Sequence, residues 1–151
     1  MVELTKSNRV NINSLKEMKE FAEQQAKLSQ PNDIILLKGN LGSGKTTFSQ
    51  FFIRCLCGNS CDVISPTFNI VLCYDSNHQY KINHIDLYRI ESVEELENLA
   101  IDDLAENNIT LVEWPEKAGN FFDDFDCKII EIQKPENSDN PEERIINSFE
   151  N

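Results

Sequence analysis

The chain has 151 residues, of which 40% are hydrophobic, so it is long enough for one domain with one sizeable core. Its 26 acidic residues outnumber 14 basic residues and give a net charge of −12, which argues against direct tight binding to nucleic acid because an acidic surface repels phosphate groups. No stretch reaches the roughly 18 apolar residues of a membrane span, and residues 1–10 lack the apolar centre of a signal peptide, so we expect a cytoplasmic protein.

The first elements that the pattern predicts are a helix and a short strand. Ser14 and Glu17 form a capping box, and apolar residues continue on one face to about residue 29. Pro31 ends this helix. Residues 34–37 form an apolar run of the kind that a buried parallel strand shows.

Residues 39–47 read GNLGSGKTT and fit the phosphate-binding pattern G-x-x-x-x-G-K-[ST]. A strand is predicted before them, and after them Phe48, Phe51 and Phe52 recur at helical spacing to about Cys57. Gly58 stands where a helix would end. The loop therefore joins a strand to a helix, which is the context that the motif requires.

The chemistry of this loop suits a nucleotide phosphate. Its glycines let the backbone curl so that successive N–H groups form a nest for anionic oxygens, and the following helix adds its partly positive N-terminus. Lys45 supplies a charge for the β- and γ-phosphates, and the Thr46 hydroxyl is placed to ligate Mg²⁺. The alternative is a glycine-rich turn that binds nothing, which the lysine at the mouth of the helix disfavours.

The middle of the chain predicts two adjacent antiparallel strands. Apolar residues alternate over residues 68–74, a polar loop follows at 75–79, and a second strand covers residues 80–86. Strands joined by so short a loop are antiparallel. We therefore expect an α/β fold with a mixed parallel and antiparallel sheet flanked by helices.

The remaining elements complete one domain. A capping box at Ser92 opens a helix, and residues 102–105 either extend it or form a short turn. Residues 109–112 form a second core strand, and residues 127–132 form the last clear strand. We predict a domain over residues 1–134 and an acidic, polar C-terminal tail over residues 135–151.

Five cysteines, Cys55, Cys57, Cys61, Cys73 and Cys127, are an odd number, and reduced thiols in a cytosolic protein are the simplest interpretation. Cys55, Cys57 and Cys61 lie close together in the sequence, so a metal cluster is an alternative interpretation. Cys55 and Cys57 lie two residues apart at a helix end, so they face different ways, which disfavours a cluster.

Two carboxylates are candidates for catalysis. A nucleotide hydrolase needs an acid at the end of a strand beside the loop, where it holds Mg²⁺ or orients the attacking water. Glu113 follows the strand at residues 109–112, and Asp86 is the second candidate. His84 shares a strand face with Asp86, either as a hydrogen-bonded pair beside a metal or as a satisfied polar pair. Glu113 could equally be a solvated acid at a strand end.

Residues 65–68 (SPTF) place two hydroxyls in a stiff loop before a strand. A threonine such as Thr67 can sense a γ-phosphate as switch loops do, although a simple turn also fits this tetrapeptide. The only arginines are Arg9, Arg54, Arg89 and Arg144. Few groups are therefore available in the chain to stabilise transition-state charge.

The loop at 39–47, the SPTF segment, residues 84–89 (HIDLYR) and residues 113–115 (EWP) come in an order and spacing that resemble the TsaE (formerly YjeE) family. Members of that family are bacterial P-loop ATPases of tRNA N6-threonylcarbamoyladenosine biosynthesis. The resemblance covers about residues 10–133. The loop alone indicates only a P-loop protein, whereas the HIDLYR and EWP elements together are specific to this family.

The resemblance implies a compact P-loop fold that holds ATP and Mg²⁺. It implies a switch role for Thr67, an acidic pair of Asp86 and Glu113 near the metal and the water, and metal ligands among Thr46, Asp86 and Glu113. It implies the TsaB and TsaD proteins as partners, with tRNA reached only through that complex and adenosine 37 as the modified base. The residues expected at the nucleotide are Asn40, Leu41, Gly42, Ser43, Gly44, Lys45, Thr46, Thr47 and Trp114.

The sequence departs from the family at two positions and leaves two other functions open. Asn40 stands where the family usually has Asp, and Ala100 stands where it tends to have Gly. A small P-loop kinase is a second interpretation, although no arginine-rich lid or acceptor motif is evident. A GTP-binding switch is a third, although N-K-x-D and D-x-x-G motifs are absent. The resemblance favours an ATPase. Because the chain has few arginines, we expect this ATPase to be slow alone and faster once its partners order the loop around Thr67.

Overall fold

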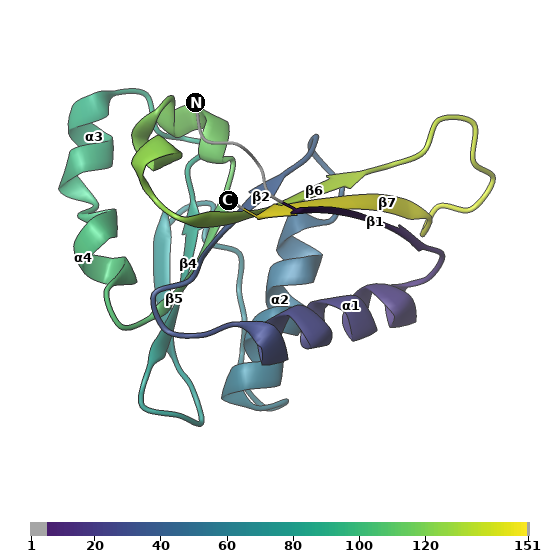
Figure 1. Cartoon of the computed structure of the whole chain (residues 1–151), viewed down its shortest axis with the longest axis horizontal. Coiled ribbons are helices and arrows are strands. Elements are labelled where there is room, and N and C mark those ends of the chain that lie inside the picture. The colour runs from purple at the N-terminus through teal and green to yellow at the C-terminus, as the bar shows by residue number, and fades with distance from the viewer. Residues whose placement is uncertain (1–5, 151) are drawn as a thin grey trace.

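Seven strands form one mixed sheet in the computed structural model, which describes residues 6–150 (Figure 1). Across the sheet they run β1-β7-β6-β2-β5-β4-β3. β2 pairs in parallel with β5 and β6, and β4 pairs in parallel with β5, whereas the other neighbours are antiparallel. The prediction of a mixed sheet is confirmed. The strands are β1 (Lys6–Ile12), β2 (Ile34–Lys38), β3 (Val71–Asp75), β4 (Lys81–Asp86), β5 (Ile109–Glu113), β6 (Cys127–Gln133) and β7 (Arg144–Glu150).

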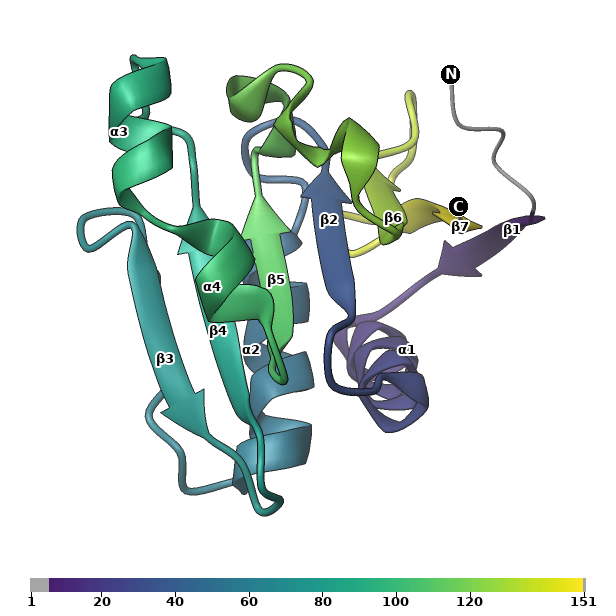
Figure 2. The same ribbon diagram turned by 60° about the vertical axis from the view of Figure 1, so that its left-hand side comes forward.

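Helices cover both faces of this sheet (Figure 2). α1 (Leu15–Leu28) and α2 (Lys45–Cys57) pack together on one face. The other face carries α3 (Val93–Asn98), α4 (Ile101–Ala105) and the 3₁₀ turns η1 (Pro115–Ala118) and η2 (Phe121–Asp124). The predicted helix at 14–29 and the predicted helix that follows the loop to about Cys57 are confirmed, and Ser14 caps α1 by accepting a hydrogen bond from the Glu17 N–H.

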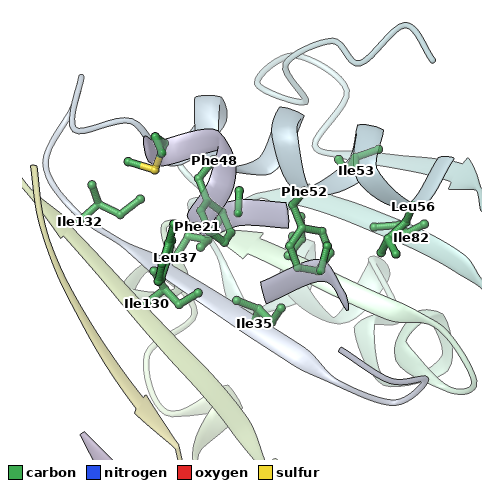
Figure 3. Close-up of a cluster of buried hydrophobic side chains, with 14 of the residues drawn as sticks. Phe21, Ile35, Leu37, Phe48, Phe52, Ile53, Leu56, Ile82, Ile130 and Ile132 are labelled. Atoms are coloured by element: carbon green, nitrogen blue, oxygen red, sulfur yellow. The ribbon is translucent and has the colours of Figure 1, made fainter. Parts of the chain in front are cut away.

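β2 is buried on both faces because it lies in the middle of the sheet. Ile35 and Leu37 belong to the core under α1 and α2, whereas Ile34 and Leu36 belong to the core on the other face. This alternation is the two-residue period of a strand. Figure 3 shows the first core, where Phe48 of α2 lies close to Phe21 of α1, with ring centroids 5.9 Å apart. The 39–47 loop therefore begins at the end of a strand that is packed on both faces.

Two predicted elements differ from the structure in their bounds. The strand predicted from residue 68 begins only at Val71, because Phe68 is 84% exposed and Ile70 has a left-handed φ of 64°. Residues 101–105 form their own short helix instead of extending α3. Ala100 separates the two helices with a left-handed φ of 49°, a conformation that glycine adopts without cost. This geometry explains why glycine suits that position.

The predicted polar tail over residues 135–151 is wrong for residues 144–150, which form β7 inside the sheet. β7 lies between β1 and β6 and pairs antiparallel with both, and its Ile146 is fully buried. β1 was not predicted either. Residues 1–5, where we expected no signal peptide, and residue 151, which ends the predicted tail, lie outside the described residues.

In the described part of the chain, residues 6–150, no helix combines the length and the apolar composition needed to cross a membrane.

Candidate functional site

The predicted functional segments meet at one edge of the sheet. β2, β4 and β5 are parallel, so their carboxyl ends lie side by side, and the 39–47 loop leaves the end of β2. Ligands of α/β proteins bind at such an edge. A cavity of about 320 Å³ opens there. Its walls come from Leu41, Gly42, Gly44, Lys45, Thr46, Thr47, Thr67, Asp86, Tyr88, Glu113, Trp114 and Arg144.

The structure thus brings together all but two of the residues that we singled out for the site. Asn40 and Ser43 line a neighbouring cavity of about 820 Å³ on the other side of the loop, together with the end of β6.

The 39–47 loop offers a row of free amide groups. Its three glycines all have positive φ, and a Cβ at Gly39 would overlap the Ile132 carbonyl, so only glycine fits there. Within residues 6–150 several backbone N–H groups have no hydrogen-bond acceptor, those of Gly42, Gly44, Lys45, Thr46 and Thr47. The N-terminus of the 13-residue α2 adds a partial positive charge. Free N–H groups at a helix N-terminus form a binding site for an anion.

Lys45 is folded back onto this loop. Its Nζ donates hydrogen bonds to the carbonyl oxygens of Gly39 at 2.5 Å and Asn40 at 3.1 Å. The same Nζ lies 4.0 Å from the centroid of the Trp114 ring, a cation–π contact. The ammonium group is therefore already placed inside the loop.

Burial lowers the pKa of Lys45 below its ordinary value, because desolvation disfavours the charged form. The nearby carboxylates of Glu113, Glu116 and Asp86 oppose this shift. A phosphate placed beside Lys45 would favour the charged form further.

The alternation of the strands places the acidic residues beside α2. Leu111 of β5 and Ile82 of β4 belong to the core under α1 and α2. Residues two apart on a strand share a face, so Glu113, His84 and Asp86 all lie on the side of α2. Asp86 and Glu113 are direct partners in the register of β4 and β5. The predicted acidic pair is therefore adjacent at the end of the sheet.

Glu113 is held by two hydrogen bonds. The Thr46 hydroxyl donates to Oε1 at 2.9 Å, and Nε2 of His84 lies 2.6 Å from Oε2. Glu113 is 2% exposed and His84 is fully buried. An ionised carboxylate only accepts hydrogen bonds, so Nε2 of His84 is the donor when Glu113 is charged. His84 thus contacts Glu113 rather than Asp86.

Asp86 is held in a similar way. Its Oδ1 accepts a hydrogen bond from the Tyr88 N–H at 2.9 Å, and its Oδ2 accepts one from the Thr67 hydroxyl at 3.2 Å. Thr67 in turn lies 2.7 Å from the Ser65 hydroxyl oxygen. The loop at residues 65–68 is therefore connected to the acidic edge of the site.

Comparison with known proteins shows the family of this chain. The model of the family described as "Threonylcarbamoyl adenosine biosynthesis protein TsaE" matches residues 12–146. The chain belongs to the TsaE family.

Curated relatives carry the same family name. The tRNA threonylcarbamoyladenosine biosynthesis protein TsaE of Rickettsia bellii is 44% identical over 70% of this chain and 72% of its own. The Haemophilus influenzae protein of that name is 36% identical over 74% of this chain and 70% of its own. The crystal structure of Bacillus subtilis YdiB superimposes with a TM-score of 0.74 and 24% identity, and covers 99% of this chain and 88% of that one. That likeness supports the fold.

A magnesium ion fits the donors at the site, which are oxygens of the kind that Mg²⁺ prefers. Within residues 6–150 no group of three or more His, Cys, Asp or Glu side chains is placed to hold a metal. Magnesium beside a nucleotide needs fewer protein ligands, because it keeps several waters and binds phosphate oxygens. The Thr46 hydroxyl and the carboxylates of Glu113 and Asp86 would hold it in this TsaE-family chain.

Sequence reasoning missed two features of the site. The His84–Glu113 pair joins residues of neighbouring strands, and only the strand order shows that they meet. Arg144 lines the cavity from β7, in the segment that we predicted as a tail. The apolar residues Ile145, Ile146 and Phe149 were the signal in that segment for a strand.

Proposed function

We propose that this TsaE-family protein binds ATP with Mg²⁺ at the 39–47 loop and hydrolyses it, in support of tRNA N6-threonylcarbamoyladenosine synthesis by a TsaB–TsaD complex. The observation that carries the proposal is the row of unpaired N–H groups beside Lys45, facing the Thr46–Glu113 pair. An anion-binding loop joined to a buried carboxylate is what phosphoryl transfer to water requires.

Binding of the phosphates involves an exchange of partners at Lys45. In the structure its ammonium group donates to the carbonyls of Gly39 and Asn40. Phosphate oxygens would replace one or both carbonyls, because a charge-assisted hydrogen bond is about twice as strong as a neutral one. Bound Mg²⁺ would neutralise part of the phosphate charge.

Hydrolysis depends on Glu113 in this proposal. Its carboxylate would accept a hydrogen bond from the attacking water or from a water on the metal. His84 fixes the orientation of this carboxylate, since it lies 2.6 Å from Oε2 and is itself fully buried. Asp86, one strand away in direct register, would hold a second water or the metal.

We expect hydrolysis by the protein alone to be slow, below about 1 s⁻¹. Among residues 6–150, Arg144 is the one arginine that lines the cavity, and its guanidinium is already engaged by backbone carbonyls. Partners would accelerate the reaction by ordering the 65–68 loop around Thr67. Phe68 in that loop is 84% exposed and Leu41 is 80% exposed at the mouth of the cavity. These side chains would give TsaB–TsaD an apolar contact beside the nucleotide.

The remaining parts of the proposal concern tRNA and location. A net charge of −12 makes direct tRNA binding weak, so the tRNA would reach this protein only through the complex, in the cytoplasm. Binding of tRNA by the protein alone with a submicromolar Kd at about 150 mM salt would contradict this part.

A fluorescence titration tests nucleotide binding directly. Trp114 is the single tryptophan, and Lys45 contacts its ring, so its emission should change when Lys45 moves to a phosphate. We expect a saturable change with ATP and Mg²⁺ and at least about tenfold weaker binding of GTP, which corresponds to ~1.4 kcal/mol. No saturable change with ATP, together with no ATP-dependent rise in Tm, would contradict the proposal. Equal affinity for GTP would favour the switch alternative, and phosphate transfer to an acceptor would favour a kinase.

A pull-down tests the partners separately. The protein should bind the TsaB–TsaD pair more tightly with ATP than without it, because the proposed contact surrounds the nucleotide. Lack of binding in both conditions would remove the partner assignment and leave the ATPase proposal standing.

A further inference from the structure

Arg144 connects the 39–47 loop to the far end of the chain. It is the first residue of β7, and its Nε donates a hydrogen bond of 2.6 Å to the carbonyl oxygen of Ser43. Its Nη1 donates to the carbonyls of Pro141 at 2.8 Å and Glu143 at 2.7 Å. One guanidinium thus ties the loop to the connection between β6 and β7.

The charge of Arg144 has no carboxylate partner within residues 6–150, because it takes part in none of their ion pairs. The side chain is half-buried, and it lines the same cavity as Lys45 and Thr46. Like Lys45, Arg144 is a cation that donates its hydrogen bonds to backbone carbonyls, although the protein carries a net charge of −12. Its guanidinium is therefore held in place by backbone carbonyls rather than by an ion pair.

The Ser43 carbonyl determines whether the Thr47 N–H is paired. In a regular helix the N–H of a residue bonds to the carbonyl four residues earlier, which for Thr47 is Ser43. Here the first such bond of α2 joins the Phe48 N–H to the Gly44 carbonyl, and the Thr47 N–H has no acceptor within residues 6–150. Arg144 occupies the Ser43 oxygen instead. The Thr47 N–H is therefore left free for a ligand.

The same bond fixes the direction of the next amide. The peptide between Ser43 and Gly44 is trans and planar, so its C=O and N–H point in opposite directions. Holding the carbonyl toward Arg144 turns the Gly44 N–H away from Arg144. Gly44 has a φ of 115°, where the absence of a side chain leaves the peptide free to rotate. The hydrogen bond from Arg144, which lies outside the loop, limits that rotation.

We propose that Arg144 is a positioning residue of the phosphate site, which keeps the N–H groups of Gly44 and Thr47 unpaired and directed for phosphate. The role as a phosphate site rests on the proposed function, whereas the effect on the loop does not. Lysine cannot replace Arg144 in this role, because only the planar guanidinium fork holds Ser43 and the β6–β7 connection together.

Glycine-selective ¹⁵N NMR can test the effect on the loop. The chain has only five glycines, of which Gly39, Gly42 and Gly44 lie in the loop and Gly58 and Gly119 lie elsewhere. In ligand-free Arg144→Lys and Arg144→Gln, we expect the Gly42 and Gly44 amide signals to shift or broaden. The Gly58 and Gly119 signals should stay in place, which shows that the variants are folded.

The matched control is Arg9→Lys and Arg9→Gln. Arg9 is exposed on β1 and faces Asn147 of β7 in the register, so it probes the same part of the sheet away from the loop. These variants should leave the loop glycines and ATP affinity unchanged.

The nucleotide measurement completes the test. Both Arg144 variants should bind ATP at least about tenfold more weakly than wild type, the effect of losing one charge-assisted hydrogen bond. Full affinity in Arg144→Lys would show that charge alone matters, and would overturn the positioning role. Unmoved signals of Gly42 and Gly44 in either variant would overturn it as well. If wild type binds no ATP, the proposed function fails, and the glycine signals still decide the role of Arg144 in the loop.

Discussion

The Thr46 hydroxyl donates a hydrogen bond of 2.9 Å to Oε1 of Glu113, which joins the first turn of α2 to the end of β5. The other oxygen of Glu113 contacts His84, so both carboxylate oxygens already have a hydrogen-bond partner in the structure. Loading the site with nucleotide and metal would draw the Thr46 hydroxyl away from Glu113, because that hydroxyl is the expected metal ligand. Oε1 would then be free to accept from a water. In the proposed function, the carboxylate of Glu113 and the nucleotide would therefore be coupled through the Thr46 hydroxyl.

Lys45→Ala should weaken ATP binding by about ten- to a hundredfold, because one charge-assisted contact to phosphate contributes about 1.5–3 kcal/mol. Isothermal titration calorimetry measures the affinity. Lys19→Ala, at an exposed position of α1, is the matched control and should bind ATP like wild type.

The Lys45→Ala protein should remain folded, with a Tm close to that of wild type. Burial lowers the pKa of Lys45, so the charged side chain costs stability below that lowered pKa, and the cost fades as the pH rises through the ordinary pKa of lysine. Removing the ammonium group at neutral pH removes this cost, which offsets the lost contacts. Unchanged ATP affinity in a folded Lys45→Ala protein would remove the central role of the loop.

His84→Leu should reduce hydrolysis by about ten- to a hundredfold and change ATP affinity by less than about threefold. Leucine fills the buried space but leaves Oε2 of Glu113 without its donor. His84→Gln should retain more of the activity, since its amide can donate at the position of Nε2. Steady-state kinetics of both variants separates kcat from KM. Equal activity of the two variants would show that the hydrogen bond to Glu113 has no part in hydrolysis.

Ile146→Ala should lower the free energy of unfolding by about 2–5 kcal/mol, because the side chain is fully buried in the centre of β7. Ile146→Val, which removes a single methyl group, should cost only about 0.5–1.5 kcal/mol. Urea unfolding measures both values. A cost below about 0.5 kcal/mol for Ile146→Ala would fit a loose tail rather than a central strand.

The difference between β2 and β7 shows which parts of the fold the sequence could predict. Residues 34–37 are an unbroken apolar run next to a glycine-rich loop, so their own pattern identifies them. β7 is stable because it is hydrogen-bonded to β6 and to β1, whose residues lie more than 130 positions earlier in the chain. Strand formation depends on such neighbours, and a local pattern does not contain them.

The residues of the site likewise divide into those that a local sequence pattern predicts and those that depend on neighbouring strands. Lys45 and Thr46 follow from a contiguous motif, whereas the His84–Glu113 pair and the Arg144–Ser43 contact depend on the order of the strands. Those two contacts could not be predicted before the sheet topology was known.

Cys57 and Cys127 should react slowly with iodoacetamide at pH 8. Burial raises the pKa of each thiol to about 12, and the thiolate is the reactive form. Because the raised pKa lies far above pH 9, the alkylation rate of partly exposed Cys57 should keep rising about tenfold per pH unit from 8 to 10. An ordinary thiol would level off near pH 9. Mass spectrometry assigns each site, with exposed Cys73 as the internal reference. A plateau for Cys57 near pH 9 would contradict its raised pKa.

Phosphate release by wild type and Glu113→Gln tests the central claim most directly. Glutamine keeps the shape of the side chain but removes its charge and basicity, so ATP binding should persist while hydrolysis falls at least about 100-fold. The assay is run at saturating ATP and Mg²⁺, with and without the TsaB–TsaD pair, and the wild-type rate should rise when the pair is present. Hydrolysis by Glu113→Gln at the wild-type rate in both conditions would contradict the assignment of Glu113 and make Asp86 the better candidate.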